Sequence, residues 1–175
     1  MDDRRVGVLG GGQLGRMMAE SCHRLGVKLC ALDPMGNKSP TGEITELCIE
    51  GSFQDPEKVQ QLAALSDVIT IEIEHVNVDA LQALERDKHK VCPNSNTIRI
   101  IQDKYLQKVH LRSFDVPLPE FMETPTMTAA IDAGKAFGYP FMLKNKRMAY
   151  DGKVSSIDTQ SYNLELMVLI YYSPS

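Results

Sequence analysis

The chain has 175 residues, which is enough for one domain and part of a second. Hydrophobic residues make up 43% of the chain, which is typical of a globular protein. The net charge is −4, which argues against a nucleic-acid partner, because proteins that bind nucleic acids are usually basic. No apolar run approaches the roughly 18–20 residues that cross a bilayer, and the N-terminus lacks the apolar core of a signal peptide, so we expect a cytoplasmic protein without a membrane partner.

The first half of the chain alternates short apolar runs with helical patterns. The predicted strands are residues 5–9, 27–32, 47–49, 67–73 and 90–92, and the predicted helices between them are 13–25, 56–65 and 79–86. Gly26 is expected to end the first helix, and Asp55 is expected to cap the second, with Pro56 at its first position. This alternation predicts an α/β fold with a mostly parallel sheet that is covered on both faces.

The composition changes after Pro93. Residues 96–114 are predicted to be helical with a break near Lys104, residues 125–137 to be a helix with Thr124 as its N-cap, and residues 140–144 to be a strand. This second part is expected not to form a sheet of its own. Residues 166–172 have high β-propensity and no charge, and if unpaired they would favour aggregation.

A glycine loop follows the first predicted strand. Residues 10–15 read Gly-Gly-Gly-Gln-Leu-Gly, which matches G-x-G-x-x-G, and Asp33 stands at the end of the second strand. Taken alone, this is the dinucleotide fingerprint. The same glycines also suit close helix–strand packing, or the binding of any phosphate or carboxylate at a helix N-terminus. NAD is disfavoured because nothing downstream supplies a hydride-transfer site.

Two acidic residues stand at the carboxyl end of the fourth predicted strand, where open α/β sheets place their ligands. Glu72 and Glu74 flank Ile73, so both carboxylates would point to one face if the strand stays regular that far. Glu74 would then hydrogen-bond a ligand amine or hydroxyl. The alternative is a solvated strand end.

An apolar strand-like run delivers Lys144, and a polar turn through Asp151 and Gly152 follows. A lysine that leaves such a strand offers a compact positive charge to a phosphate. Backbone N–H groups of the turn would close over the same anion. The segment therefore predicts half of a nucleotide clamp, with a strand-edge lysine and an ordinary β-hairpin as the alternatives.

These motifs occur in a specific order. The glycine loop is followed by Glu-Ile-Glu-His-Val at 72–76, Asp-Lys-Tyr-Leu-Gln-Lys at 103–108, and the lysine and turn at 144–153. In this the chain resembles the 5-(carboxyamino)imidazole ribonucleotide synthetase family, the ATP-dependent part of phosphoribosylaminoimidazole carboxylase in the ATP-grasp superfamily. The resemblance implies a Rossmann-like pre-ATP-grasp substrate domain at 1–95, the start of an ATP-grasp lid at 96–153, and an unmatched tail at 154–175.

The resemblance also implies a reaction. ATP phosphorylates bicarbonate to carboxyphosphate, and the exocyclic amine of aminoimidazole ribonucleotide captures the carboxyl group during purine biosynthesis. Mg²⁺ would spread the charge of the transferring phosphoryl group. The family's Mg²⁺ ligands lie beyond the matched part, and the family pattern departs after Lys153, so we expect a truncated or frame-shifted product that is inactive alone. Pairing into a homodimer and fusion to a mutase domain occur in the family.

Site residues carry over position by position. The implied ATP contacts are Lys104, Lys144, Tyr150, Asp151, Gly152 and Lys153, with Asp151 also catalytic. The implied ribonucleotide contacts are Gly12, Gln13, Leu14 and Glu74. No metal ligand is implied, and the cysteines and histidines show no metal-binding spacing. The competing functions are an NAD-dependent oxidoreductase built on the glycine loop and a nucleotide-binding fragment without turnover.

Overall fold

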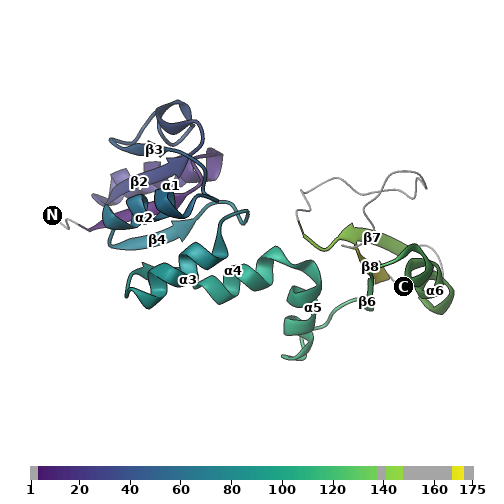
Figure 1. The fold of residues 1–175 in the computed structure, drawn as a ribbon. Helices are drawn as coiled ribbons and strands as arrows, with labels where there is room; N and C mark the ends of the chain where they lie inside the picture. Colours follow the sequence, from purple (N-terminus) through teal and green to yellow (C-terminus); the bar gives the residue numbers. More distant parts are fainter. Residues whose placement is uncertain (1–3, 138–140, 148–166, 172–175) are drawn as a thin grey trace. The chain divides into compact units, whose positions relative to one another are not determined.

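The computed structural model describes residues 4–137, 141–147 and 167–171. Contacts divide the chain into a first unit, Met1–Arg99, and a second unit, Ile100–Ser175. Each unit has its own sheet (Figure 1). None of the helices in the described ranges combines the length and the apolar character that crossing a membrane requires.

The first unit is built on a five-stranded sheet whose order is β3-β2-β1-β4-β5. Every neighbouring pair is parallel, which confirms the predicted α/β class. The strands are β1 (Arg5–Leu9), β2 (Lys28–Asp33), β3 (Cys48–Glu50), β4 (Val68–Ile71) and β5 (Lys90–Val91). The carboxyl ends of β1, β2 and β4 therefore share one edge of the sheet, at the glycine loop.

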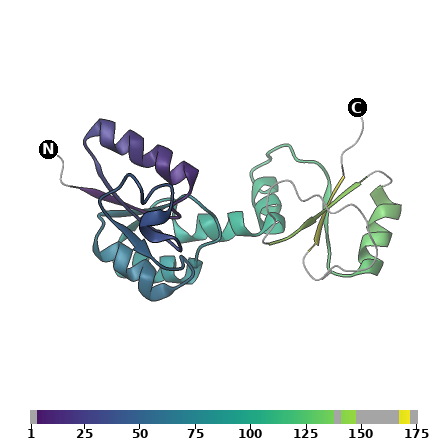
Figure 2. The same ribbon diagram turned by 90° about the horizontal axis from the view of Figure 1, so that it is seen from above.

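Helices cover both faces of this sheet, as the alternation predicted. The helices are α1 (Gln13–Leu25), α2 (Pro56–Ala64) and α3 (Val78–Arg86), followed by α4 (Ser95–Gln102), with a short 3₁₀ turn η1 (Gly36–Lys38). Figure 2 shows α1 on one face and α2 with α3 on the other. Buried Val8 and Ala31 pack with Ala19 of α1, while their strand neighbours Leu9 and Leu32 are fully buried as well. Burial on both faces explains why these strands are continuously apolar.

The caps of these helices follow the sequence. Gly26 ends α1 with a φ of 68°, a left-handed conformation that suits glycine. The Asp55 side chain accepts the Glu57 N–H at the start of α2. Asn77 does the same for the Ala80 N–H at the start of α3.

The second unit contains a three-stranded antiparallel sheet in the order β6-β8-β7. Its elements are α5 (Lys104–Arg112), β6 (Phe121–Thr124), α6 (Met127–Phe137), β7 (Phe141–Asn145) and β8 (Met167–Tyr171). Figure 2 shows α5 and α6 on opposite faces of this sheet. The expectation that this part forms no sheet is wrong: β6 was not predicted, and β8 takes the centre of the sheet.

Two further details of the second unit differ from expectation. Thr124 is the last residue of β6 and is buried, and α6 begins only at Met127. The Thr126 hydroxyl, not Thr124, accepts the Ala129 N–H and caps α6. Residues 167–171 are paired on both sides, so the condition under which residues 166–172 would favour aggregation is not met at these five residues.

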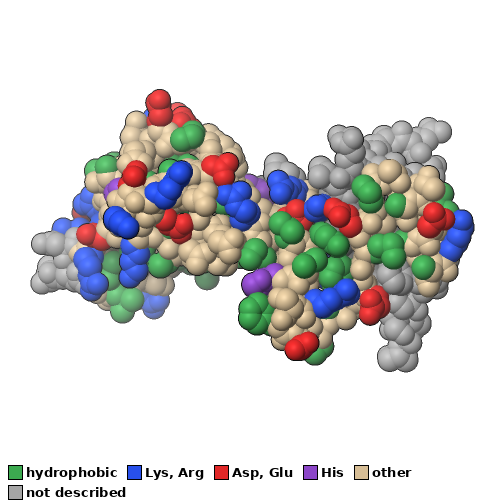
Figure 3. All heavy atoms as spheres, turned by 60° about the horizontal axis from the view of Figure 1, so that its bottom comes forward, with side chains coloured by type: hydrophobic (Ala, Val, Ile, Leu, Met, Phe, Trp, Pro, Cys, Tyr) green, Lys and Arg blue, Asp and Glu red, His purple; other side chains and the backbone are tan. Residues whose placement is uncertain are grey.

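The outer side of α5 and the turn after it are apolar. Leu106, Val109, Phe114 and Val116 are all exposed. The rings of His110 and Phe114 stack edge to face, with their centroids 5.0 Å apart. Figure 3 shows hydrophobic and basic side chains interspersed over the second unit.

Candidate functional site

The glycine loop joins β1 to α1 and requires glycine at particular positions. Gly10 has a φ of 100°, and its N–H donates to the Leu32 carbonyl at 3.0 Å. A Cβ added to Gly15 would lie 2.5 Å from the Thr41 hydroxyl oxygen and 3.1 Å from the Gly10 carbonyl oxygen. Close packing therefore explains Gly15 without a ligand.

Asp33 fastens this loop to the backbone. One carboxylate oxygen accepts the Gly11 N–H and the other accepts the Met35 N–H, both at 2.8 Å. In the dinucleotide fingerprint the acidic residue at this position binds a ribose hydroxyl. Here both oxygens are engaged by the protein itself, which further disfavours the NAD interpretation.

The N-terminus of α1 has no side-chain cap. Gly12 is the N-cap residue, and the first turn contains no acidic residue. Leu14 is 59% exposed, and the nearby guanidinium of Arg16 is directed to the carboxylates of Glu20 and Glu43, at 3.4 and 3.1 Å. The first N–H groups of a helix need acceptors and attract anions. The N–H groups of Gln13 and Leu14 therefore suit the phosphate of a ligand, beside Gly12, whose own N–H is directed to the Glu72 carboxylate.

The expected arrangement of Glu72 and Glu74 on a regular strand is wrong. β4 ends at Ile71, and the chain then bends, with the Val76 N–H donating to the Glu74 carbonyl at 2.9 Å. The Glu72 carboxylate turns to the glycine loop and accepts the Gly12 N–H at 3.4 Å, while the Glu74 carboxylate lies 3.8 Å from His75 Nε2. The alternation that would place both carboxylates on one face ends with the strand.

In the second unit, a buried carboxylate organises the start of α5. Asp103 is 2% exposed, and one of its oxygens accepts the N–H groups of Tyr105 and Leu106, both at 3.0 Å. Its other oxygen lies 3.7 Å from Lys146 Nζ and 3.3 Å from Arg147 Nε. Asp103 therefore caps α5 and ties that helix to the end of β7.

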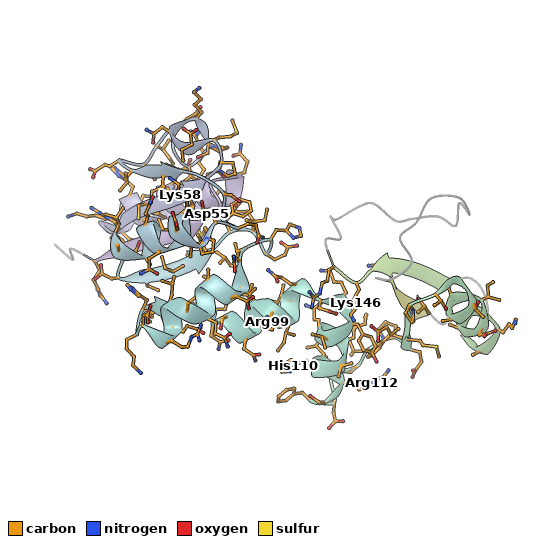
Figure 4. All side chains as sticks on the ribbon, in the orientation of Figure 1. Asp55, Lys58, Arg99, His110, Arg112 and Lys146 are labelled. Atoms are coloured by element: carbon orange, nitrogen blue, oxygen red, sulfur yellow. The ribbon has the colours of Figure 1, made fainter. Side chains whose placement is uncertain are left out.

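A backbone hydrogen bond reinforces this junction. The Lys104 N–H donates to the Lys146 carbonyl at 2.8 Å. Lys146, labelled in Figure 4, lies beside the start of α5. Its Nζ also pairs with the Glu123 carboxylate and stands 5.5 Å from the centre of the Tyr105 ring. The hydrogen bond to Glu123 raises the pKa of Lys146, and the Asp103 charge adds to this effect. Lys146 is thus a structural cation.

Lys104 and Lys144, the two lysines implied to contact ATP, are both half-buried at this junction. Lys144 lies in β7, and Lys146 follows just past the end of that strand. A lysine that the sequence analysis did not single out lies beside Lys144: burial and the Lys144 charge lower the pKa of Lys108. Its position one turn after Lys104 in the same motif was the available signal.

The other predicted ATP contacts cannot be placed. Tyr150, Asp151, Gly152 and Lys153 lie outside the described residues, so their roles stay predictions. Within the described ranges, no three His, Cys, Asp or Glu side chains form a group that could hold a metal ion. These residues do not by themselves make a Mg²⁺ site, and we assign no chemical step to Mg²⁺.

Comparisons with known proteins agree with this layout. The model of the ribonucleotide synthetase preATP-grasp domain matches residues 3–102, and that of the ATP-grasp domain matches residues 109–171. The phosphoribosylaminoimidazole carboxylase of Schizosaccharomyces pombe is 47% identical over 148 residues, which are 85% of this chain and 27% of that protein. The N5-carboxyaminoimidazole ribonucleotide synthase of Staphylococcus saprophyticus is 34% identical over 85% of this chain and 39% of its own length.

Solved structures give the same result. The carboxyaminoimidazole ribonucleotide synthase of Aspergillus clavatus, complexed with ATP, superposes with a TM-score of 0.86 at 40% identity, over 98% of this chain and 47% of that one. The enzyme from that organism in complex with ADP and 5-aminoimidazole ribonucleotide gives a TM-score of 0.84 at 36% identity. The chain spans about a quarter to two fifths of the length of these curated relatives. It belongs, as its motifs indicated, to the ribonucleotide synthetase preATP-grasp family that includes the 5-(carboxyamino)imidazole ribonucleotide synthetases.

Proposed function

We propose that the whole protein to which this chain corresponds carboxylates 5-aminoimidazole ribonucleotide with bicarbonate at the expense of ATP, in purine biosynthesis. In this reaction ATP supplies the phosphoryl group that activates bicarbonate. The ribonucleotide amine then attacks the activated carboxyl carbon, forming a C–N bond as phosphate leaves. The part of this function that we assign to the present chain is binding. The glycine loop holds the ribonucleotide, and Lys104 and Lys144, where the start of α5 meets the end of β7, hold the phosphates of ATP.

One observation carries the ribonucleotide assignment. The N-terminus of α1 lacks a side-chain cap and is displayed at the carboxyl edge of a parallel sheet. A phosphate accepting the free N–H groups at Gln13 and Leu14 would meet the positive end of the helix dipole. Glu74, in the bend after β4, is our candidate for a contact to the ribonucleotide amine or a hydroxyl.

The fit of ATP is supported in the second unit. Lys104 and Lys144 are half-buried at a junction that Asp103 and the Lys104–Lys146 backbone hydrogen bond hold in place. Two half-buried lysines on a backbone held in this way favour a polyanion, which can neutralise both charges. Tyr150, Asp151, Gly152 and Lys153 remain candidates for closing over these phosphates, with Asp151 as the catalytic candidate.

Calorimetry on this chain tests the ribonucleotide site. We expect 5-aminoimidazole ribonucleotide to bind and the corresponding ribonucleoside, which lacks the phosphate, to bind at least tenfold more weakly, since charged hydrogen bonds contribute about 1.5–3 kcal/mol. Equal binding of the two, or binding of NADH with none of the ribonucleotide, would overturn the proposal.

A pair of variants isolates the backbone donor. Gln13→Pro removes the N–H at the first helical position, where proline is tolerated and where the preceding residue, Gly12, is already extended, with φ −73° and ψ −160°. Gln13→Ala removes the side chain and keeps the N–H. We expect the proline variant to lose several-fold more ribonucleotide affinity than the alanine variant. A cytoplasmic location stays a prediction from the sequence, and a homodimer and association with a mutase domain stay predictions from the family resemblance.

A further inference from the structure

The geometry of the second unit places Lys108 close to Lys144, one of the lysines that the resemblance implies to contact ATP. α5 and β7 meet where the Lys104 N–H donates to the Lys146 carbonyl, at the start of the helix and just past the end of the strand. There, Lys146 Nζ lies 5.5 Å from the Tyr105 ring. One helical turn further along α5 is Lys108, and two residues back along β7 is Lys144. Lys144 is in register across β8 with Glu123, so its side chain leaves the sheet on the same face as those of Glu123 and Phe121. Lys108 Nζ stands over the Phe121 ring on that face, where the charge of Lys144 acts on it.

The stem of Lys108 is fixed on the sheet side of α5. Its Nζ stands 5.6 Å from the centre of the Phe121 ring, and Phe121 is only 7% exposed. Tyr105 meets the same ring edge to face with centroids 5.8 Å apart, and the Arg112 guanidinium lies 4.0 Å from its centre. These contacts orient Lys108 toward the sheet instead of letting it extend into solvent as an ordinary surface lysine.

The other cations around this helix have carboxylate partners. Lys146 pairs with Glu123 and Asp103, Arg147 with Asp103, and Arg112 with Glu120. Across the described part of the chain, no carboxylate lies within ion-pair distance of Lys108 or of Lys144. Two half-buried ammonium groups side by side repel each other, and burial and the Lys144 charge lower the pKa of Lys108. An anion between them would relieve that repulsion.

We propose that Lys108 is a further phosphate-binding residue, which forms with Lys144 a two-cation seat for the polyphosphate chain of a nucleotide. This assignment rests on the proposed function, in which Lys144 contacts the phosphates of ATP, and extends it to a residue that the family motif did not mark. A polyphosphate fits better than a single carboxylate because its several negative charges can neutralise both ammonium groups. Phe121 and Tyr105 support the seat without contacting the phosphates.

Inorganic tripolyphosphate tests the seat apart from the adenine ring and from the ribonucleotide. Calorimetry would measure its binding to the 175-residue chain and to Lys108→Met, which keeps an unbranched apolar stem on Phe121. We expect Lys108→Met to weaken tripolyphosphate binding about tenfold or more and to reduce the dependence of the affinity on salt. Lys108→Arg, which keeps the charge, should retain most of the affinity.

The matched control is Lys135→Met on α6. Lys135 is 70% exposed and pairs with Asp132 at 3.0 Å, so its removal should leave tripolyphosphate binding unchanged. Equal affinity of Lys108→Met and the unmodified chain, or no tripolyphosphate binding by the unmodified chain, would overturn the proposal. If tripolyphosphate binding depends on Lys108 but the chain binds no ribonucleotide, the phosphate-binding role of Lys108 is supported and the proposed function is contradicted.

A second measurement is made on the unmodified chain. Carbon-13 NMR of the lysine ε-methylene groups reports the pKa of Lys108 directly, with Lys108→Arg used only to assign its resonance. Because an anion favours the charged ammonium, we expect tripolyphosphate to raise this pKa from its lowered value. A purely structural Lys108 would titrate identically with and without tripolyphosphate, and that result would contradict the assignment.

Discussion

The buried carboxylate of Asp103 lies 3.3 Å from Arg147 Nε, and in the same position it accepts the N–H groups at the start of α5. One side chain thus fixes both the helix that carries Lys104 and Lys108 and the strand end that follows Lys144. Asp103→Asn keeps an oxygen for the cap and removes the charge. We expect it to lower the free energy of unfolding by about 1–3 kcal/mol, because Lys146 and Arg147 lose a buried partner.

Urea unfolding followed by circular dichroism would measure this loss. Asp132→Asn is the control, because Asp132 pairs with Lys135 in an exposed position where such pairs contribute about 0–1 kcal/mol. If the two variants lose the same stability, Asp103 does not hold the junction together.

Gly15→Ala should destabilise the first unit by about 1–3 kcal/mol, because its Cβ would approach the buried Thr41 hydroxyl at 2.5 Å and the Gly10 carbonyl at 3.1 Å. The backbone neighbour cannot rotate away as the tip of a side chain can. Thermal unfolding would compare this variant with Gln13→Ala, which alters the exposed first position of the same helix. An unchanged midpoint for Gly15→Ala would show that the loop has more room than this packing implies.

Lys108→Met should not lower stability at neutral pH, although it weakens phosphate binding. The pKa of Lys108 lies below its ordinary value of 10.5 because of burial and the Lys144 charge. The unfolded chain therefore binds this proton more tightly, and the charge opposes folding at all pH values below the folded pKa. That opposition is relieved as pH rises through the folded pKa. The stability of the unmodified chain relative to that of Lys108→Met should therefore increase in alkaline solution. Thermal unfolding of both at pH 7 and pH 10 would measure this change.

A clear loss of stability in Lys108→Met at pH 7 would contradict this account. It would mean that the contact with Phe121 outweighs the repulsion, as expected of a structural lysine. Lys135→Met serves again as the control, since Lys135 has an exposed carboxylate partner in Asp132.

Val168→Pro should disrupt the strand pairing in the sheet of the second unit. Val168 lies in the central strand β8, in register with Glu123 on one side and Lys144 on the other. Proline cannot donate to a ladder and is excluded from central strands. Hydrogen exchange should show the amides of β7 losing protection while those of β1 and β4 keep theirs. Retained protection in β7 would show that its pairing does not depend on this strand.

Much of the first unit could be predicted from the sequence because local signals and global packing agree there. Gly26 and Asp55 act as expected, and continuously apolar strands indicate a parallel sheet with two covered faces. The glycine loop indicated a strand-to-helix turn. The carboxylates that accept hydrogen bonds from this loop could not be predicted, because the contacts of Asp33 with Gly11 and of Glu72 with Gly12 join residues far apart in the chain.

The errors share a physical cause. Strand β6 is short and lies among Pro119, Pro125 and polar residues, so its alternation was too weak to distinguish from a linker. β8 becomes regular through pairing with β6 and β7, which no local pattern encodes. Asp103 carried a usable signal, as an aspartate directly before a helical pattern, but its ion pairs with Lys146 and Arg147 depend on the tertiary fold.

The proposed ribonucleotide phosphate site at the N-terminus of α1 is tested most directly by backbone amide NMR during titration with 5-aminoimidazole ribonucleotide. We predict that the amide resonances of Gly12, Gln13 and Leu14 shift on binding, and that the ribonucleoside without its phosphate leaves these three unmoved. Identical shifts with both ligands, or shifts confined to other residues, would contradict the claim that this helix N-terminus receives the ribonucleotide phosphate.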